Sequence, residues 1–278
     1  MFINDRLVYL QMQKTGCTHI ARLLQEYVGG RTLQKHARLA SGPGDRVVIG
    51  SVRDPWDWYV SLWAFGCAGE GALYHLLTNP KFAERASART SDIQPPGGNH
   101  EKWRELYGDP RDVDLYRSWL DFFLSDSGKC DLPEGYAESP LSKFCGFMTY
   151  RFVFLYTNNS KWIEIGKSVD DDKKLQEFFE EHNVIDRMVY MENLERDLFQ
   201  ILRDIGYEGI HGIERPRSRT NSSKHLRYQE YYNGEAEDLV AKEEKFIIDR
   251  YGYKRPGSAK AEPRQLVKIR VTPRISKP

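Results

Sequence analysis

The segment from Leu7 to Leu24 most constrains the fold, because it has the pattern of a buried strand, a tight polar turn and the start of a helix. The run from Leu7 to Met12 is mostly apolar and favours β-structure. In the turn that follows, Gly16 can adopt a backbone conformation that other residues resist. Apolar residues then recur at helical spacing, at Ile20, Leu23, Leu24 and Tyr27. A strand that breaks into a helix directs backbone N–H groups and the positive end of the helix dipole to one spot, which suits a phosphate or another tetrahedral anion.

The polar residues of this turn add donors to the predicted anion site. Lys14 contributes a full positive charge, and Thr15 and Thr18 contribute hydroxyl groups. The Walker A loop does not fit, because its lysine follows the second glycine, whereas Lys14 precedes Gly16. An ordinary strand-to-helix turn with a solvated lysine is the alternative interpretation of this segment.

A second strand of the same kind also ends at a positive charge. Residues 46–52 form a nearly continuous apolar run, as buried parallel strands do, and Arg53 follows them directly. Asp54 is suited to cap the next helix, on which Ser61 would lie. Because the carboxyl ends of neighbouring strands form the ligand site of an open α/β sheet, we expect Lys14 and Arg53 to border one site for two separated phosphates.

The whole chain has the composition of a globular domain with a sizeable core. It has 278 residues, of which 40% are hydrophobic and 29% charged, so it does not have the composition of a disordered chain. A third buried strand is predicted at 185–191. Further helices are predicted at 72–77, 116–124, 141–156, 170–182 and 194–205. Strands alternating with helices predict the α/β class, with a central parallel sheet flanked by helices.

Three motifs resemble those of sulfotransferases that use 3′-phosphoadenosine 5′-phosphosulfate (PAPS). Lys-Thr-Gly-Cys-Thr at 14–18 resembles the loop that binds the 5′-phosphosulfate. Arg-Asp-Pro at 53–55, together with Ser61, resembles the motif that binds the 3′-phosphate. Lys-His-Ala at 35–37 resembles the segment between them in the carbohydrate-type, family 2-like branch. The resemblance implies a P-loop-like three-layer fold and a sulfotransferase domain at 1–253.

The resemblance also implies which residues bind PAPS. The 5′-phosphosulfate would be bound by Lys14, Thr15, Gly16, Cys17 and Thr18. Arg53 and Ser61 would hold the 3′-phosphate. The resemblance requires no metal ion, and no group of Asp, Glu and His has the spacing of metal ligands.

Two residues are expected to act in catalysis. Lys14 would neutralise charge that grows on the leaving oxygen. His36 would be the general base that takes the proton of the acceptor hydroxyl, since the pKa of histidine lies near neutral pH. His19, directly after the loop, is the nearest rival, and an acidic residue from the middle of the chain is another.

A basic segment at 215–228 could be a second clamp on the nucleotide, a solvated face or a nucleic-acid patch. Its Asn-Ser-Ser-Lys-His run resembles a loop of the carbohydrate-type branch that folds over the nucleotide, which makes Arg219 and Lys224 candidate contacts. The segment Glu192-Asn193-Leu194 also resembles a sulfotransferase motif. We interpret Glu192 as structural, holding loops near the site.

Residues 67–140 have little pattern beyond two helices, and we interpret them as an insertion that forms the acceptor site. Candidate acceptor contacts are His75, His100, Trp103 and Trp119. A helical cap without substrate contact is the alternative. The acceptor is expected to bear a hydroxyl, less often an amine, and could be a saccharide or a small metabolite.

The tail at 254–278 holds eight Lys or Arg and one acidic residue, so its net charge is +7, against +1 for the whole chain. It is expected to be a basic tail, or to add an edge strand at 265–272. The four cysteines lack metal spacing and the N-terminus lacks a signal-peptide pattern, which predicts a cytoplasmic protein. We expect neither a membrane span nor a nucleic-acid partner, and the sequence does not indicate an oligomeric state.

Two other classes of function stay open. One is a nucleotide kinase or NTPase with a degenerate phosphate loop, which the missing Walker A pattern disfavours. The other is a non-catalytic module that binds polyanions through the basic segment and the tail, with affinity that depends strongly on salt.

Overall fold

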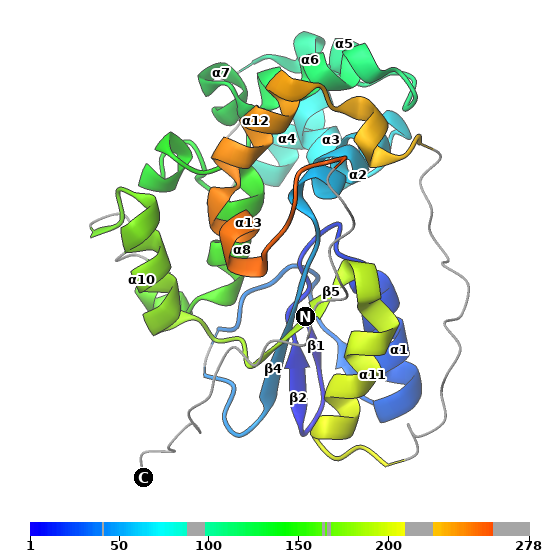
Figure 1. Ribbon diagram of the computed structural model, residues 1–278, viewed down its shortest axis with the longest axis vertical. Helices are drawn as coiled ribbons and strands as arrows, with labels where there is room; N and C mark the ends of the chain where they lie inside the picture. Colours follow the sequence, from blue (N-terminus) through cyan, green and yellow to red (C-terminus); the bar gives the residue numbers. More distant parts are fainter. Residues whose placement is uncertain (41, 88–97, 163–164, 166–167, 209–224, 258–278) are drawn as a thin grey trace.

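The computed structural model describes residues 1–40, 42–87, 98–162, 165, 168–208 and 225–257 (Figure 1). Within this part of the chain, a sheet has the strand order β3-β1-β2-β4-β5. The strands are β1 (Phe2–Ile3), β2 (Leu7–Tyr9), β3 (Arg31–Thr32), β4 (Val47–Val52) and β5 (Arg187–Tyr190). Strands β2, β4 and β5 are parallel, with Tyr9 opposite Ile49 and Ile49 opposite Arg187. The prediction of an α/β fold with a parallel sheet at its centre is therefore confirmed.

The sheet as a whole is mixed, a feature that the predicted central parallel sheet does not include. Strand β1 pairs antiparallel with both β2 and β3. The cause is a tight turn after β1, in which the Asn4 side chain accepts hydrogen bonds from the N–H groups of Arg6 and Leu7 at 3.0 and 2.9 Å. So short a connection can join only antiparallel strands.

Side chains of the sheet alternate between two hydrophobic clusters that cover its opposite faces. Leu7 and Tyr9 of β2 join the cluster formed with α1 (Cys17–Val28) and α11 (Leu194–Asp204). Val8 of β2 joins the larger cluster on the other face. That cluster includes residues of α8 (Phe147–Tyr156), α10 (Asp172–His182) and α13 (Lys245–Tyr251). Figure 1 shows α1 and α11 on one side of the sheet and α10 on the other.

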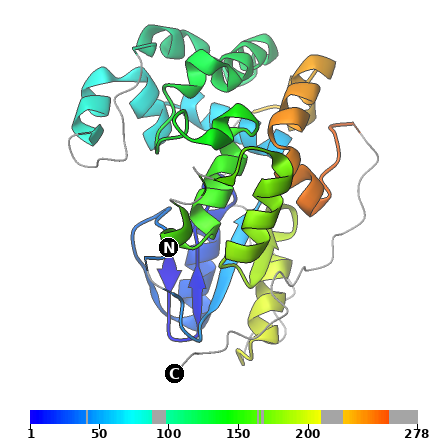
Figure 2. The same ribbon diagram turned by 90° about the vertical axis from the view of Figure 1, so that its left-hand side faces the viewer.

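The remaining helices gather beyond the carboxyl ends of the parallel strands (Figure 2). They are α2 (Pro55–Cys67), α3 (Ala72–Thr78), α4 (Pro80–Ser87), α5 (His100–Leu106), α6 (Val113–Leu124), α7 (Asp126–Lys129) and α12 (Gly234–Glu243). Short 3-10 helices are η1 (Pro140–Lys143), η2 (Asn159–Lys161), η3 (Met191–Asn193) and η4 (Tyr228–Tyr231). Trp103 and Trp119 are fully buried in the aromatic core of this helical part, so the expectation that they line an acceptor site is wrong.

A single buried carboxylate explains one difference from the predicted helices. Glu244 accepts hydrogen bonds from the N–H groups of Met148 and Thr149 at 3.2 and 2.8 Å, and so caps α8. The cap explains why the regular helix begins at Phe147 rather than at 141. Glu244 itself lies at the boundary between α12 and α13.

No helix in the described ranges is long and apolar enough to cross a membrane.

Candidate functional site

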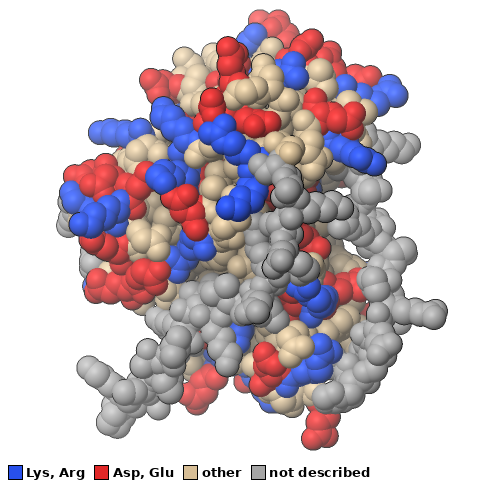
Figure 3. All heavy atoms as spheres, in the orientation of Figure 1, with Lys and Arg blue, Asp and Glu red and all other residues tan. Residues whose placement is uncertain are grey.

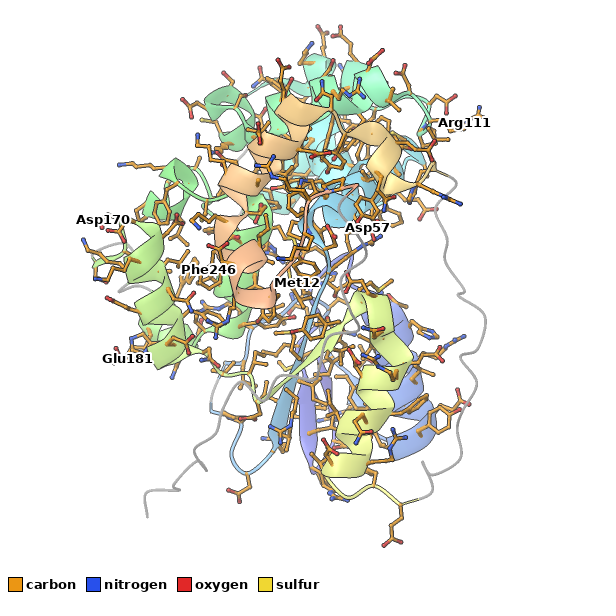
Figure 4. The ribbon with its side chains drawn as sticks, in the orientation of Figure 1. Met12, Asp57, Arg111, Asp170, Glu181 and Phe246 are labelled. Carbon is orange, nitrogen blue, oxygen red and sulfur yellow. The ribbon has the colours of Figure 1, made fainter. Side chains whose placement is uncertain are left out.

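The two predicted anion-binding segments meet at the carboxyl ends of adjacent parallel strands. Lys14 lies in the turn after β2, and Arg53 follows β4 directly. The Nη1 group of Arg53 donates a hydrogen bond to the carbonyl oxygen of Lys14 at 2.9 Å. The prediction that these two residues lie together at the carboxyl ends of adjacent parallel strands is therefore confirmed. Figure 4 labels Met12 and Asp57, which also lie in the region between the sheet and the helices beyond its carboxyl ends.

The turn after β2 presents unused donors. The backbone N–H groups of Lys14, Thr15 and Gly16 make no hydrogen bond within the described part of the chain. Lys14 has a left-handed backbone with φ 62°, and its Nζ lies 3.8 Å from the centre of the Phe65 ring. Burial, aided by the charge of Arg53, lowers the pKa of Lys14 to about 8. No acidic side chain described here forms an ion pair with Lys14, so its charge is available to a bound anion.

The side chains of the other loop residues face different ways. Thr15 is fully buried, and its hydroxyl donates to the carbonyl oxygen of Met12 at 2.8 Å and contacts the Ser51 hydroxyl at 2.7 Å. The expectation that this hydroxyl serves an anion is therefore wrong, and only the N–H of Thr15 is left for a ligand. Cys17 is buried, which raises the pKa of its thiol, whereas Thr18 is exposed and accepts a hydrogen bond from Lys35.

Gly16 is required by conformation and by space. Its φ is +73°, in the left-handed region that side chains disfavour. A Cβ atom at this position would lie 2.4 Å from Cδ1 of Leu194 and 2.8 Å from Sδ of Met191. The glycine thus lets the loop pack closely against the start of α11.

We predict that Gly16→Ala lowers the free energy of unfolding more than Gly252→Ala does. Gly252 has the same left-handed backbone, with φ 64° and ψ 32°, but a Cβ there would meet nothing within 4 Å. Gly252→Ala should cost about 1–2 kcal/mol, for the left-handed backbone alone. Gly16→Ala should cost about 1–3 kcal/mol more, for overpacking. Chemical denaturation of both variants measures the difference, and equal losses would contradict the close packing of the loop.

Arg53 is held in place and still has free donors. Its Nε donates to Oδ2 of Asp57 at 2.9 Å, and its Nη2 lies 2.7 Å from Oδ1 of the same carboxylate. With Nη1 bonded to Lys14, two of the five guanidinium N–H groups, one on each Nη, are left for a ligand. Ser61 lies one turn of α2 beyond Asp57, on the same side of the helix, and its hydroxyl makes no hydrogen bond in the described structure.

The residues after Arg53 form the helix start that the sequence predicts. Asp54 caps α2 by accepting hydrogen bonds from Trp56 and Asp57, and Pro55 is the first residue of the helix. The N–H of Asp54 donates to Oε1 of Glu192 at 2.8 Å, which confirms that Glu192 holds loops together near the site. Burial, together with the charges of Glu192 and Asp57, raises the pKa of Asp54 to about 7. Asp54 therefore carries only part of its charge at neutral pH, which weakens its repulsion of a bound anion.

His36 lies beside the strand that leads into the loop, with its ring in a defined tautomer. Its Nδ1 lies 2.6 Å from the carbonyl oxygen of Gln11. A carbonyl oxygen can only accept, so Nδ1 carries the proton and Nε2 of the neutral ring carries a lone pair. Nε2 makes no hydrogen bond in the described structure, so it is available as a base. Burial, followed by the charges of Arg151 and Lys35, lowers the pKa of His36 to about 4.

The rival base His19 is engaged elsewhere. Its Nε2 lies 2.7 Å from Oε1 of Glu195 at the start of α11, and its Nδ1 lies 3.0 Å from Nη2 of Arg22. Both ring nitrogens of His19 thus have partners, one on α11 and one within α1, whereas Nε2 of His36 has none in the described structure.

Backbone strain marks the same two residues. Only Lys14, His36 and Glu134 combine a side chain with a positive φ in the described chain. Such residues cost about 1–3 kcal/mol each and cluster at functional sites. Lys14 and His36, the two residues expected to act in catalysis, are therefore two of the three described non-glycine residues with a positive φ.

Some predicted contacts are not placed. The candidate contacts Arg219 and Lys224 lie outside the described residues, and so does the tail beyond residue 257.

Two candidate acceptor contacts within 67–140 are described. His75 lines a surface hollow of about 610 Å³ between Gly69 and Arg104, and a ring nitrogen of His100 contacts the carbonyl oxygen of Leu77. No group of three or more potential metal ligands occurs among the described residues.

Sequence reasoning missed Gln13 and Arg151. The Gln13 side chain accepts a hydrogen bond from Nη2 of Arg151 at 3.2 Å, and its backbone carbonyl accepts from the Trp58 indole at 2.9 Å. These contacts tie the loop to α8 and α2. An arginine within the apolar run at 141–156 was the signal that could have identified Arg151.

Comparison with known proteins finds no matching family model, no similar curated protein and no similar solved structure.

Proposed function

We propose that this chain is a PAPS-dependent sulfotransferase with a P-loop-like three-layer fold. It would transfer a sulfuryl group from PAPS to an acceptor hydroxyl, less often an amine, and release 3′,5′-ADP. A saccharide is the favoured acceptor, because the motifs resemble the carbohydrate-type branch. A cytoplasmic location is supported by the four cysteines, which are all free thiols.

The contact between Arg53 and Lys14 carries this proposal. It joins two cationic side chains at the ends of adjacent parallel strands, where ligands of α/β sheets bind. The free N–H groups of the 14–16 turn suit one phosphate, and the free N–H groups of Arg53 with the Ser61 hydroxyl suit another. A nucleotide with phosphates on both its 3′ and 5′ carbons needs two such sites.

The chemistry follows from these positions. PAPS supplies an activated sulfuryl group. The Lys14 ammonium would stabilise negative charge on the leaving oxygen, as positioned cations do in phosphoryl transfer. Nε2 of His36 would take the proton of the acceptor hydroxyl. Lys14 lies in the turn after β2 and His36 in the segment after β3, so the proposed cation and the proposed base are held by different segments.

A kinase or NTPase with a degenerate loop remains the second candidate, and a polyanion-binding module the third. The described residues of the basic segment, 225–228, do not by themselves favour the module. On the face shown in Figure 3, Lys and Arg are interspersed with Asp and Glu rather than gathered in one field.

One experiment separates the three classes. The protein is incubated with labelled PAPS and a panel of acceptors in the presence of EDTA, and sulfated product and 3′,5′-ADP are measured. Turnover without metal supports the sulfotransferase. ATP hydrolysis that requires Mg²⁺, without binding of 3′,5′-ADP, supports the NTPase. Salt-sensitive binding of a polyanion without turnover supports the module.

We predict that Arg53→Ala weakens binding of 3′,5′-ADP but not of 5′-AMP, which lacks the 3′-phosphate. Loss of a charge-assisted hydrogen bond worth about 1.5–3 kcal/mol should raise the Kd for 3′,5′-ADP about 10- to 100-fold. Ser61→Ala should have a smaller effect, since its hydroxyl is neutral. Isothermal titration calorimetry measures each Kd. An equal rise in the Kd of both nucleotides would mean that Arg53 only supports the 14–16 turn, through its hydrogen bond to Lys14.

We also predict that affinity for 3′,5′-ADP falls above pH 8. A bound phosphate favours the charged form of Lys14, whose pKa is lowered to about 8 in the free protein by burial and by Arg53. Binding is therefore at full strength below pH 8, and above it the Kd rises until it levels off at the loss expected for Lys14→Met, less than about tenfold. Lys14→Arg should abolish this dependence between pH 7 and 10, because a guanidinium stays charged. A wild-type Kd that stays constant over this range would exclude Lys14 as the titrating contact.

A further inference from the structure

Two arginines lie against one aromatic ring next to the proposed catalytic base. The guanidinium carbon of Arg38 lies 4.5 Å from the centre of the Phe154 ring and 5.3 Å from that of Trp162. The guanidinium carbon of Arg151 lies 5.7 Å from the Phe154 ring. Arg38 comes from the segment after β3 and Arg151 from α8, so the fold brings together two cations that are distant in sequence.

The charges of this pair are only half compensated. Arg151 forms an ion pair with Glu134, whereas Arg38 forms none with any described residue. Among the described residues, the hydrogen bonding of Arg38 is limited to a contact of 3.5 Å from Nη2 to the carbonyl oxygen of Asn158. Arg38, Arg151 and Glu134 together therefore carry a net charge of +1, next to aromatic rings that exclude water.

Polar atoms of both arginines are buried without partners. Nε of Arg38 and Nε of Arg151 have no hydrogen-bond partner in the described structure. Arg151 is 2% exposed, and burial lowers the pKa of Arg151 to about 9 and that of Arg38 to about 10. Buried charge without a partner is costly, so such a pair calls for a ligand of opposite charge.

The pair lies where an acceptor would have to bind. Arg38 is two residues from His36, and Nη2 of Arg151 donates to the side chain of Gln13, which directly precedes Lys14. Arg151 is also near enough to His36 for its charge to act on the ring. The pair is thus attached to the proposed base on one side and to the proposed phosphosulfate loop on the other.

We propose that Arg38 and Arg151 form an anion subsite for the acceptor, and that the acceptor carries a carboxylate or sulfate group near the hydroxyl that is sulfated. This inference rests on the proposed function, since it names the acceptor of that reaction. Arg38 would provide the direct contact through its Nη groups, because Nη1 makes no hydrogen bond in the described structure and Nη2 makes only the long contact with Asn158, whereas Nε is buried. Arg151, held by Glu134 and Gln13, supports it from the buried side.

An anion in this subsite would also act on the base. The positive charge of Arg151 helps to keep the pKa of His36 low in the free protein. A carboxylate on the pair would offset that charge and raise the pKa of His36, which makes it a stronger base only when the anionic acceptor is bound. The subsite would therefore favour anionic acceptors in binding and in the chemical step.

The test compares acceptors that differ in one charge, 4-nitrophenyl β-glucuronide and 4-nitrophenyl β-glucoside. Ligand-observed NMR measures the Kd of each for the whole chain, and this readout does not depend on turnover. We expect wild type to bind the glucuronide about 10- to 100-fold more tightly, the range for a charge-assisted pair. Arg38→Gln should reduce this preference to less than about threefold, and Arg38→Lys should give an intermediate preference, because it keeps the charge but loses the planar fork.

Arg111→Gln is the matched control, because Arg111 is exposed and lies at the outer edge of the helical part, away from Met12 (Figure 4). It should keep the wild-type preference. Equal binding of the two glycosides to wild type, or a preference that survives in Arg38→Gln with an unchanged thermal unfolding curve, would overturn the subsite. Tighter binding of the corresponding glucoside 6-sulfate than of the glucuronide would identify sulfate as the preferred group. Titration with 3′,5′-ADP runs in parallel, so that a failure of the proposed function is seen separately from a failure of this inference.

Discussion

Lys14→Met should lower kcat by about 10²–10³, the effect of removing one preorganised group that stabilises charge in a transition state. Methionine keeps most of the length and apolar contact of the side chain over the Phe65 ring but removes the charge. Affinity for 3′,5′-ADP should fall less than about tenfold, because the N–H groups of Lys14, Thr15 and Gly16 remain. Single-turnover kinetics with PAPS and calorimetry with 3′,5′-ADP measure the two effects separately.

The variant Lys14→Arg tests whether the shape of the cation matters as well as its charge. It keeps the charge but replaces a compact ammonium by a broad planar group. We expect nucleotide affinity near that of wild type and a kcat between those of wild type and Lys14→Met. A Lys14→Met variant with unchanged kcat and strongly weakened 3′,5′-ADP binding would assign Lys14 to ground-state binding and refute its role in the transition state.

The sequence predicts the centre of the fold well, because that centre is built from local patterns. Apolar runs that end in a polar turn mark β2, β4 and β5, and each is followed by the expected helix. The adjacency of Lys14 and Arg53 follows from the parallel pairing of β2 with β4. These features depend on strand burial and helix caps, which short segments specify.

Prediction from the sequence fails for features that depend on contacts between segments distant in the chain. The antiparallel strand β1 is two residues long, too short to leave a pattern. The break before α8 depends on Glu244, which lies 95 positions after Thr149 in the sequence. Thr15 matches the motif, yet its hydroxyl turns inward because Ser51 of the neighbouring strand offers it a partner. The Arg38–Arg151 pair likewise forms only when the segment after β3 packs on α8.

His36→Asn should lower kcat by about 10²–10⁴, the usual contribution of a positioned general base. Asparagine is the suitable replacement, because it tolerates the left-handed backbone that His36 adopts at φ 57°. Its amide can also donate to the carbonyl oxygen of Gln11, as Nδ1 of the ring does. The variant should therefore keep the local structure and lose only the lone pair of Nε2. Binding of 3′,5′-ADP should be unchanged.

The matched control is His19→Asn, which removes the contact with Glu195 of α11 and the contact with Arg22 within α1. It should lower stability while kcat stays within a few-fold of wild type. If His19→Asn and not His36→Asn abolishes turnover, the base has been assigned to the wrong histidine. If neither does, the base is an acidic residue or the acceptor needs none.

The pH dependence of kcat/KM gives an independent test of His36, since this parameter reports on ionisations of the free enzyme. Burial and the charges of Arg151 and Lys35 lower the pKa of His36 from 6.5 to about 4. The base must be neutral to accept a proton, so activity should be full above the lowered pKa and lost as pH falls through about 4. Arg151→Gln removes one of these positive charges and should move the acid limb to higher pH. An acid limb near 6.5 in wild type that does not move in Arg151→Gln would place the titrating base elsewhere.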